Sequence, residues 1–127
     1  MNLNQVTIKS ANLDNSEDFY LTLGLRLIVK NVDYLRFECP EGGSTFSVEA
    51  ADKGSLRPGG VTIYFEIEDL DVQCRRLSDL GIEFYELPVD TPWLWREARL
   101  RDPDGHELCL FRAGSNRRNP PWKIKDD

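Results

Sequence analysis

The fold is decided by residues 100–111, which read Leu-Arg-Asp-Pro-Asp-Gly-His-Glu-Leu-Cys-Leu-Phe. Pro103 fixes its φ angle, Asp104 tolerates a left-handed conformation, and Gly105 takes a positive φ without steric cost. The alternating segments on either side are typical of strands, so this stretch predicts a β-hairpin. Residues 39–44, Cys-Pro-Glu-Gly-Gly-Ser, precede another alternating run at 45–49. Two such hairpins predict a repeated module.

The repeat has a spacing of 57 residues and needs no insertion between its anchors. Leu13-Asp14 recurs as Leu70-Asp71, Leu23-Gly24-Leu25 as Leu80-Gly81-Ile82, and residues 5–8 fall on residues 62–65. Each copy starts with period-two alternation, which indicates a half-buried strand.

A helix is expected after the first strand of each copy. Asp14 and Glu17 fit a capping box, and Leu70, Cys74 and Leu77 follow helical spacing. Gly24 and Gly81 are suited to end the two helices. Three strands then follow in each copy, at 25–30, 34–39 and 45–49, and at 82–86, 97–101 and 107–111, with a long connection over 88–96.

Two copies of this βαβββ order resemble the vicinal oxygen chelate superfamily, which includes glyoxalase I, bleomycin resistance proteins, fosfomycin resistance proteins and extradiol dioxygenases. The resemblance covers residues 4–112, with modules at about 4–56 and 58–112 and a C-terminal tail at 113–127. It implies an α+β fold in which the modules form a cupped mixed sheet with the helices outside. It also implies a small-molecule site in the cup. The alternative is another α+β sandwich.

The composition indicates which classes of partner and which cellular compartment to expect. The net charge of −6 disfavours nucleic acid and suits cationic or neutral small ligands. Three cysteines without paired short spacings indicate a reducing, cytoplasmic location. The sequence contains neither a signal-peptide pattern nor an apolar run long enough to span a membrane, so no membrane association is expected.

Alternation also predicts which side chains line the cup, because the apolar series should pack under the helices. The expected ligand-binding residues on the strands are Gln5, Thr7, Ser47, Glu49, Thr62, Tyr64, Cys109 and Phe111, with Leu35 and Phe37 on the adjoining strand. Trp93 and Trp95 lie in the connection that borders the cup in this superfamily. They either stack on a planar or cationic ligand or anchor a core or a dimer interface. Arg99 either lines the cup or pairs with an acidic neighbour.

The resemblance places four metal-ligand positions of the metal-dependent members at Gln5, Ser47 or Glu49, Thr62 and Cys109. These residues do not make a coherent site, because Thr62 is a poor ligand and Cys109 suits only soft metals. The chain has one histidine, His106, so the two-histidine iron site of a dioxygenase is excluded. We therefore predict no metal and no cofactor. A general base at Glu49 would need apolar surroundings and a nucleophile at Cys109 would need a neighbouring base, so a rim carboxylate and a packed side chain are favoured and no catalytic residue is assigned.

The first functional hypothesis is a cytoplasmic glyoxalase/bleomycin-resistance-like protein that binds a small organic ligand without a catalytic metal, with antibiotic resistance by sequestration as the implied role. A lyase or isomerase with a degenerate or dimer-shared metal site at Gln5 and Glu49 is the alternative. A regulatory module with a vestigial cup is the third. The resemblance implies a homodimer.

Overall fold

The computed structural model describes residues 1–125, which divide into two compact units. The first unit contains residues 1–59 together with residues 102–106, and the second contains residues 60–101 and 107–125. Of the tail expected at 113–127, the last two residues lie outside the described part. The boundaries of a single domain at 4–112 remain a prediction.

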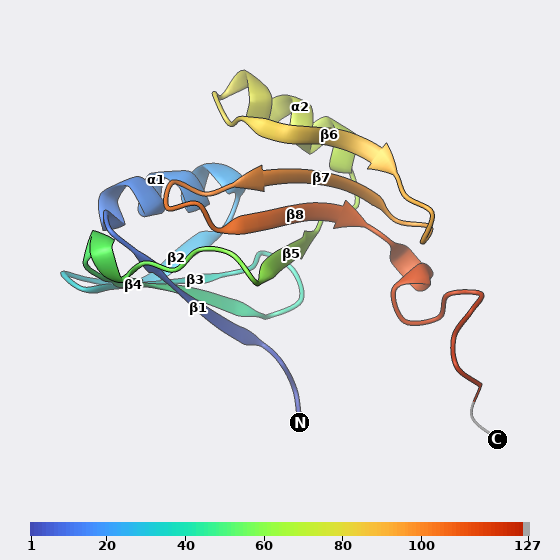
Figure 1. Ribbon diagram of the computed structural model, residues 1–127, viewed down its shortest axis with the longest axis horizontal. Coiled ribbons are helices and arrows are strands. Elements are labelled where there is room, and N and C mark those ends of the chain that lie inside the picture. The colour runs from blue at the N-terminus through green and yellow to red at the C-terminus, as the bar shows by residue number, and fades with distance from the viewer. Residues whose placement is uncertain (126–127) are drawn as a thin grey trace. The chain divides into compact units, whose positions relative to one another are not determined.

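The first unit is a four-stranded mixed sheet with one α-helix (Figure 1). Its elements are β1 (Gln5–Ser10), α1 (Leu13–Leu23), β2 (Arg26–Asn31), β3 (Tyr34–Glu38), β4 (Thr45–Ala50) and the short 3-10 helix η1 (Lys53–Ser55). The strand order is β1-β4-β3-β2, with β1 and β4 parallel and the other pairs antiparallel.

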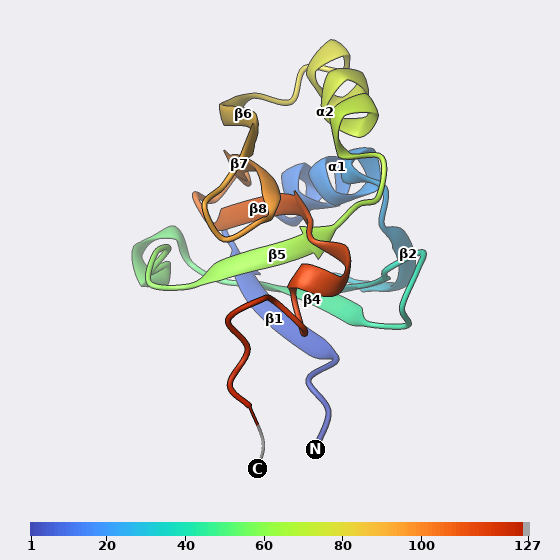
Figure 2. The same cartoon turned by 90° about the vertical axis from the view of Figure 1, so that its right-hand side faces the viewer.

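The second unit repeats this plan. Its elements are β5 (Thr62–Glu66), α2 (Leu70–Asp79), β6 (Phe84–Asp90), β7 (Arg96–Arg101), β8 (Glu107–Arg112) and η2 (Gly114–Asn116). The strand order is β5-β8-β7-β6, with β5 and β8 parallel, and Figure 2 shows α2 along one side of these strands. The predicted α+β class and the two βαβββ modules are confirmed.

The helix boundaries follow the repeat, although one predicted cap is wrong. Both helices start 57 residues apart, at Leu13 and Leu70, and Gly24 ends α1 with a φ of 118°. The side chain that caps α1 belongs to Asn12, whose Oδ1 accepts a hydrogen bond from the backbone N–H of Asn15. Asp14 lies inside the first turn, where its negative charge interacts favourably with the helix dipole. It is not the capping residue that the predicted capping box required.

Strand β6 is longer than expected and takes in part of the predicted connection at 88–96. Pro88 is tolerated because β6 is an edge strand, and the pairing with β7 is irregular between Glu86 and Val89. A proline removes one ladder donor, which an edge strand with a bulge can accommodate. The connection therefore shrinks to the turn around Trp93.

Each unit buries an apolar core between its helix and one face of its sheet. In the first unit, the buried Tyr20 ring of α1 lies 4.7 Å from the ring of Phe46 and 5.9 Å from that of Phe37. In the second unit, Leu70 and Leu77 of α2 are fully buried, as are Leu108 and Leu110 of β8. Alternation then directs the intervening side chains to the opposite sheet face.

Candidate functional site

The first sheet carries a polar network on the face turned away from α1. Gln5 pairs with Thr45 and Thr7 with Ser47 along the parallel ladder, so these side chains share that face. The Gln5 Nε2 donates to Ser47 Oγ at 2.9 Å and to Thr7 Oγ1 at 3.1 Å, while its Oε1 accepts from Thr45. Strands β1 and β4 are thereby linked through side chains as well as backbone.

Ser47 extends this network to β3. It is fully buried, and its Oγ lies 2.5 Å from the Tyr34 hydroxyl, which also accepts a hydrogen bond from Arg36 Nε at 2.9 Å. The hydrogen bond from Ser47, together with that from Arg36, lowers the pKa of the Tyr34 phenol. Tyr34 and Arg36 are functional candidates that the sequence prediction missed.

Two sequence-predicted residues of this sheet lie elsewhere. Phe37 is fully buried against Tyr20 in the core, so its predicted position on the open face is wrong, as is that of Leu35, which is 1% exposed. Glu49 does share the polar face but is exposed, opposite Lys9 on β1 and Tyr34 on β3. The apolar surroundings that would favour Glu49 as a general base are not provided by Phe37.

The second sheet carries an aromatic cluster on the face turned away from α2. The Trp95 and Phe111 rings stack with centroids 4.7 Å apart and an angle of 22° between their planes. The Tyr64 ring meets both edge-on, at 5.9 Å from Trp95 and 5.6 Å from Phe111. Phe111 is 4% exposed and Tyr64 is 45% exposed, so Tyr64 forms the accessible edge of the cluster.

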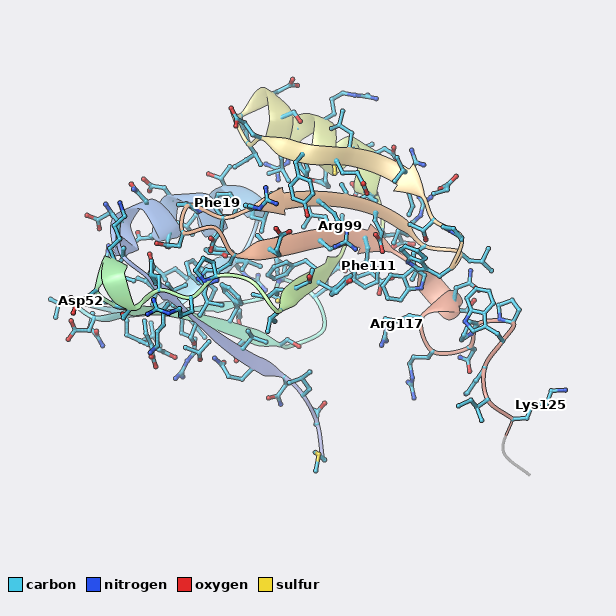
Figure 3. All side chains as sticks on the ribbon, viewed as in Figure 1. Phe19, Asp52, Arg99, Phe111, Arg117 and Lys125 are labelled. Atoms are coloured by element: carbon cyan, nitrogen blue, oxygen red, sulfur yellow. The ribbon has the colours of Figure 1, made fainter. Side chains whose placement is uncertain are left out.

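A charged pair lies beside these rings. The Arg99 Nη2 donates to Glu97 Oε2 at 3.1 Å, and the Arg99 guanidinium carbon lies 5.9 Å from the Tyr64 ring centroid. The Glu97 side chain is only 3% exposed and also accepts a hydrogen bond from Trp93 Nε1 at 3.0 Å. Figure 3 labels Arg99 on β7 and Phe111 on β8, and the strand register directs both side chains to the same face.

Hydrogen bonds favour the charged form of Arg99 in this partly buried position. Burial alone would lower the pKa of its guanidinium, but hydrogen bonds to Tyr64 and Glu97 outweigh that effect and raise it. Arg99 therefore pairs with an acidic neighbour, one of its two predicted roles, while its place in a ligand site stays a prediction. Glu97 was not predicted, although its place two residues before Arg99 puts it on the same face.

A strained turn holds the two tryptophans. Leu94 has a φ of 66° and is the single non-glycine residue with a positive φ among residues 1–125. The turn is closed by hydrogen bonds between Thr91 and Trp95, including Thr91 N–H to the Trp95 carbonyl at 2.8 Å. The turn separates the two indoles. Trp95 packs on Phe111, whereas Trp93 is 44% exposed and reaches Glu97.

The residues at the metal-ligand positions do not fit a metal in the second unit. Cys109 is fully buried, and burial together with the nearby Glu97 raises the pKa of its thiol to about 12, which disfavours the thiolate that binds metals. Thr62 offers only a neutral hydroxyl, which is a weak ligand.

The first unit is no better suited. The Gln5 amide is engaged with Ser47, Thr7 and Thr45, and Ser47 is engaged with Tyr34. Across residues 1–125, no three or more His, Cys, Asp or Glu side chains are grouped closely enough to hold a metal ion. The donor chemistry therefore does not match the metal that the superfamily's enzymes use.

His106 lies in the hairpin turn, which belongs to the first unit, and it contacts β1 of that unit. Its Nε2 is 2.7 Å from the Lys9 carbonyl oxygen, and its backbone N–H donates to Asp102. These contacts give it a structural role in the turn.

Two βαβββ modules, each with a helix on one face of a mixed sheet and polar or aromatic side chains on the other, define a two-module α+β protein. A family model described as "Glyoxalase/Bleomycin resistance protein/Dioxygenase superfamily" matches residues 2–110. The chain belongs to this superfamily, so the resemblance drawn from its sequence is confirmed.

Solved structures agree with this assignment. A glyoxalase/bleomycin resistance protein/dioxygenase from Nocardioides has a TM-score of 0.77 at 25% identity, covering 98% of this chain and 90% of its own. A lactoylglutathione lyase from Agrobacterium tumefaciens has a TM-score of 0.75 at 19% identity, covering 93% and 96%. A bleomycin-binding protein in complex with bleomycin has a TM-score of 0.68 at 20% identity, covering 88% and 98%.

No curated protein sequence matches the chain significantly. No helix within residues 1–125 is long and apolar enough to cross a membrane.

Proposed function

We propose that this protein binds a small organic molecule with a planar aromatic group on the face of the second sheet turned away from α2, without a catalytic metal. The ligand's ring packs on the accessible edge of Tyr64 and on Trp93. Its polar atoms reach the N–H groups of Arg99 that Glu97 does not use. The chain thereby sequesters the ligand.

The observation that carries this proposal is the buried Glu97–Arg99 pair beside exposed aromatic rings. A carboxylate that is 3% exposed has a large desolvation cost, and a buried ion pair seldom stabilises a fold as well as apolar residues would. Such a pair on the face opposite the helix, next to a tyrosine that is 45% exposed, is better explained by recognition than by stability. The bleomycin-binding protein supports the proposal, because there the same fold holds bleomycin.

The charge of the preferred ligand follows from the pair. Glu97 and Arg99 neutralise each other, so a charged ligand would lose its hydration without finding an unpaired counter-charge. A neutral aromatic ligand with a hydrogen-bond acceptor loses less hydration free energy on binding. We therefore expect neutral compounds to bind more tightly than cationic or anionic ones of the same shape.

The test uses one ring system in three charge states at pH 7, namely 1-naphthol, 1-naphthoate and 1-naphthylmethylammonium. At about ten times its Kd, a ligand that binds only the folded protein stabilises it by about 1.4 kcal/mol, which is detectable as a rise in Tm. We expect the largest rise with 1-naphthol. If none of the three compounds raises the Tm, the proposal fails.

Variants locate the site. Tyr64→Leu should weaken 1-naphthol binding by about fivefold, because one aromatic contact contributes about 1 kcal/mol. Trp93→Phe should also weaken binding, because the Glu97 carboxylate loses its indole donor. Trp122→Phe is the matched control, since Trp122 is similarly exposed but lies in the tail. Equal binding by the Tyr64, Trp93 and Trp122 variants would contradict the proposal.

The metal-assisted lyase or isomerase is tested separately. Stoichiometric zinc, nickel or manganese in the purified protein, lost in Gln5→Ala or Glu49→Ala, would replace the metal-free proposal with that alternative. Binding of 1-naphthol that survives treatment with a chelator supports the metal-free form.

We also propose that the protein is a cytoplasmic homodimer. The free thiols Cys39, Cys74 and Cys109 support a reducing compartment. Light scattering on the purified protein measures its oligomeric state, and a monomer at micromolar concentration would contradict the dimer. A role in antibiotic resistance is tested by expressing the protein in a drug-sensitive host.

A further inference from the structure

The polar network of the first unit contains a tyrosine whose hydroxyl oxygen accepts two hydrogen bonds. The Arg36 guanidinium can only donate, so the bond between its Nε and the Tyr34 oxygen, 2.9 Å long, assigns one acceptor role to that oxygen. The second contact of that oxygen is with Ser47 Oγ at 2.5 Å, and there either group could be the donor.

Counting hydrogens assigns the direction of the second bond. Ser47 Oγ already accepts a hydrogen from Gln5 Nε2. Because Ser47 is fully buried, its own hydroxyl hydrogen needs a protein acceptor, and within residues 1–125 the Tyr34 oxygen is the acceptor in contact with it. Ser47 therefore donates to Tyr34. The Tyr34 oxygen accepts twice, and its own O–H is left to donate outward from the sheet.

We propose that Tyr34 is the hydrogen-bond donor of a second binding site, on the polar face of the first sheet, which takes the carboxylate or carbonyl oxygen of a small ligand. The site lies wholly within the first unit and does not depend on the aromatic site of the second. Tyr34 is partly exposed, so a ligand can reach its hydroxyl.

The charges around Tyr34 permit an anionic ligand oxygen. Arg36 lies two residues along the same strand, with its guanidinium carbon 5.4 Å from the Tyr34 ring centroid. Glu49 faces Tyr34 from β4, and Lys9 faces Glu49 from β1. The next acidic residue on this strand, Glu38, is paired with Arg26 at 3.2 Å. Arg36 balances the carboxylate of Glu49 beside Tyr34, and Lys9 adds a positive charge on the far side of Glu49, so the site does not repel an anionic ligand oxygen.

The phenol is also polarised as a donor. Two hydrogen bonds into the oxygen draw electron density from the O–H bond, which strengthens the hydrogen bond that it donates. This is consistent with the lowered pKa of Tyr34 described above. A tyrosine placed only for packing would not require two convergent donors.

The experiment uses benzoate as the probe and tyrosine labelled with ¹³C at Cζ. The chain has four tyrosines, so four resonances are expected, and Tyr→Phe variants assign each one. Benzoate should move the Tyr34 resonance saturably. In Tyr34→Phe, binding followed by calorimetry should weaken about tenfold, because a hydrogen bond to a charged acceptor contributes about 1.5 kcal/mol or more.

Two further variants test the geometry. Ser47→Ala removes one donor to the Tyr34 oxygen, and Arg36→Lys replaces the guanidinium Nε donor with a differently placed ammonium while keeping the positive charge. Both should weaken benzoate binding, whereas Tyr64→Phe, in the second unit, should leave it unchanged. Unaltered resonances of the other tyrosines in each variant show that the fold is intact.

The proposal is overturned if the Tyr34 resonance does not respond to benzoate, or if Tyr34→Phe binds benzoate as tightly as the parent. Loss of 1-naphthol binding in Tyr64→Leu with benzoate binding retained supports two separate sites. Failure of 1-naphthol binding alone leaves the Tyr34 site standing.

Discussion

The Tyr20 hydroxyl donates a hydrogen bond of 2.6 Å to Asp102 Oδ2, across 82 residues of sequence. Both residues are buried, at 0% and 5% exposure. The other oxygen of Asp102 accepts from the backbone N–H groups of Asp104 and His106, which shapes the turn. The turn at 102–106 is therefore folded by its own aspartate and fixed to α1 by Tyr20, and for this reason it belongs to the first unit.

Removing this bond should destabilise the protein. In Tyr20→Phe the ring still fills the core, but Asp102 Oδ2 loses its side-chain donor in a buried position, and an unsatisfied buried group costs about 1–3 kcal/mol. The free energy of unfolding, measured with urea, should fall by that amount. Tyr85→Phe is the control, because Tyr85 donates to Glu107 at an exposed site. Equal losses in the two variants would contradict this account.

The same bond predicts sensitivity to alkali. Burial, and then the charge of Asp102, raise the pKa of Tyr20 above its ordinary value. A raised folded-state pKa means that the folded protein holds the phenol proton more tightly, so its contribution to stability is complete below about pH 10 and is lost as the pH rises further. Urea unfolding should show a steeper loss of stability above that pH in the parent than in Tyr20→Phe. Parallel curves would rule out this linkage.

Leu94 should be a site where glycine is more stable than alanine. A leucine with positive φ costs about 1–2 kcal/mol, and its side chain is 48% exposed, so little burial is lost on removing it. We expect Leu94→Gly to be up to about 1 kcal/mol more stable than Leu94→Ala, which keeps the strained Cβ. Urea unfolding of both variants measures this difference. Leu94→Ala as the more stable variant would mean that the turn carries no strain.

Much of the fold was predictable because its signals are local and repeated. Leu13 and Leu70 start helices at the repeat distance, and Gly24 ends α1 with the positive φ that its position required. The wrong cap shows the limit of such signals. Asp14 and Asn12 both suit a cap, and only the backbone hydrogen bond to Asn15 distinguishes them.

The site was less predictable because it depends on the face that each strand presents. On β3, the residues Tyr34, Leu35, Arg36 and Phe37 alternate regularly between the two faces. Because Phe37 was assigned to the open face, Tyr34 and Arg36 were missed as residues of that face. The contact partners of the two tryptophans were not predictable either. Nothing in the sequence indicates that Trp95 stacks on Phe111 while Trp93 reaches Glu97, because the turn at Leu94 separates the two indoles.

The three cysteines should differ sharply in reactivity. Burial raises the pKa of all three thiols, to about 12 for Cys109 and about 11 for Cys74, and Cys39 is the one that is partly exposed. At pH 8 a thiol with a pKa of about 12 is ionised in roughly one molecule in ten thousand, and the thiolate is the reactive form. An aromatic disulfide reagent should modify one thiol in the folded protein and the other two only after unfolding. The fast reaction should disappear in Cys39→Ser. If a fast reaction remains in that variant, the thiol of Cys74 or Cys109 is accessible in the folded protein and the prediction is wrong.

An ion pair between Asp71 and Arg96 joins the first turn of α2 to β7. This pair should make the free energy of unfolding depend on pH in the acidic range. Asp71 accepts two hydrogen bonds from Arg96, of 2.9 and 2.8 Å, and the bond from Arg96 lowers the pKa of the Asp71 carboxyl. A lowered folded-state pKa means that the contribution of this pair is present above the ordinary aspartate pKa of about 4 and is lost as the pH falls through the lower folded value. Asp71→Asn should therefore unfold at a lower urea concentration than the parent at pH 7, and this difference in urea midpoint should disappear below about pH 4.

Asp79→Asn, at the other end of α2, is the control, and its difference in urea midpoint from the parent should not shrink in this way. A gap between parent and Asp71→Asn that persists unchanged at pH 3 would mean that the amide disturbs packing and that the charge of Asp71 contributes nothing.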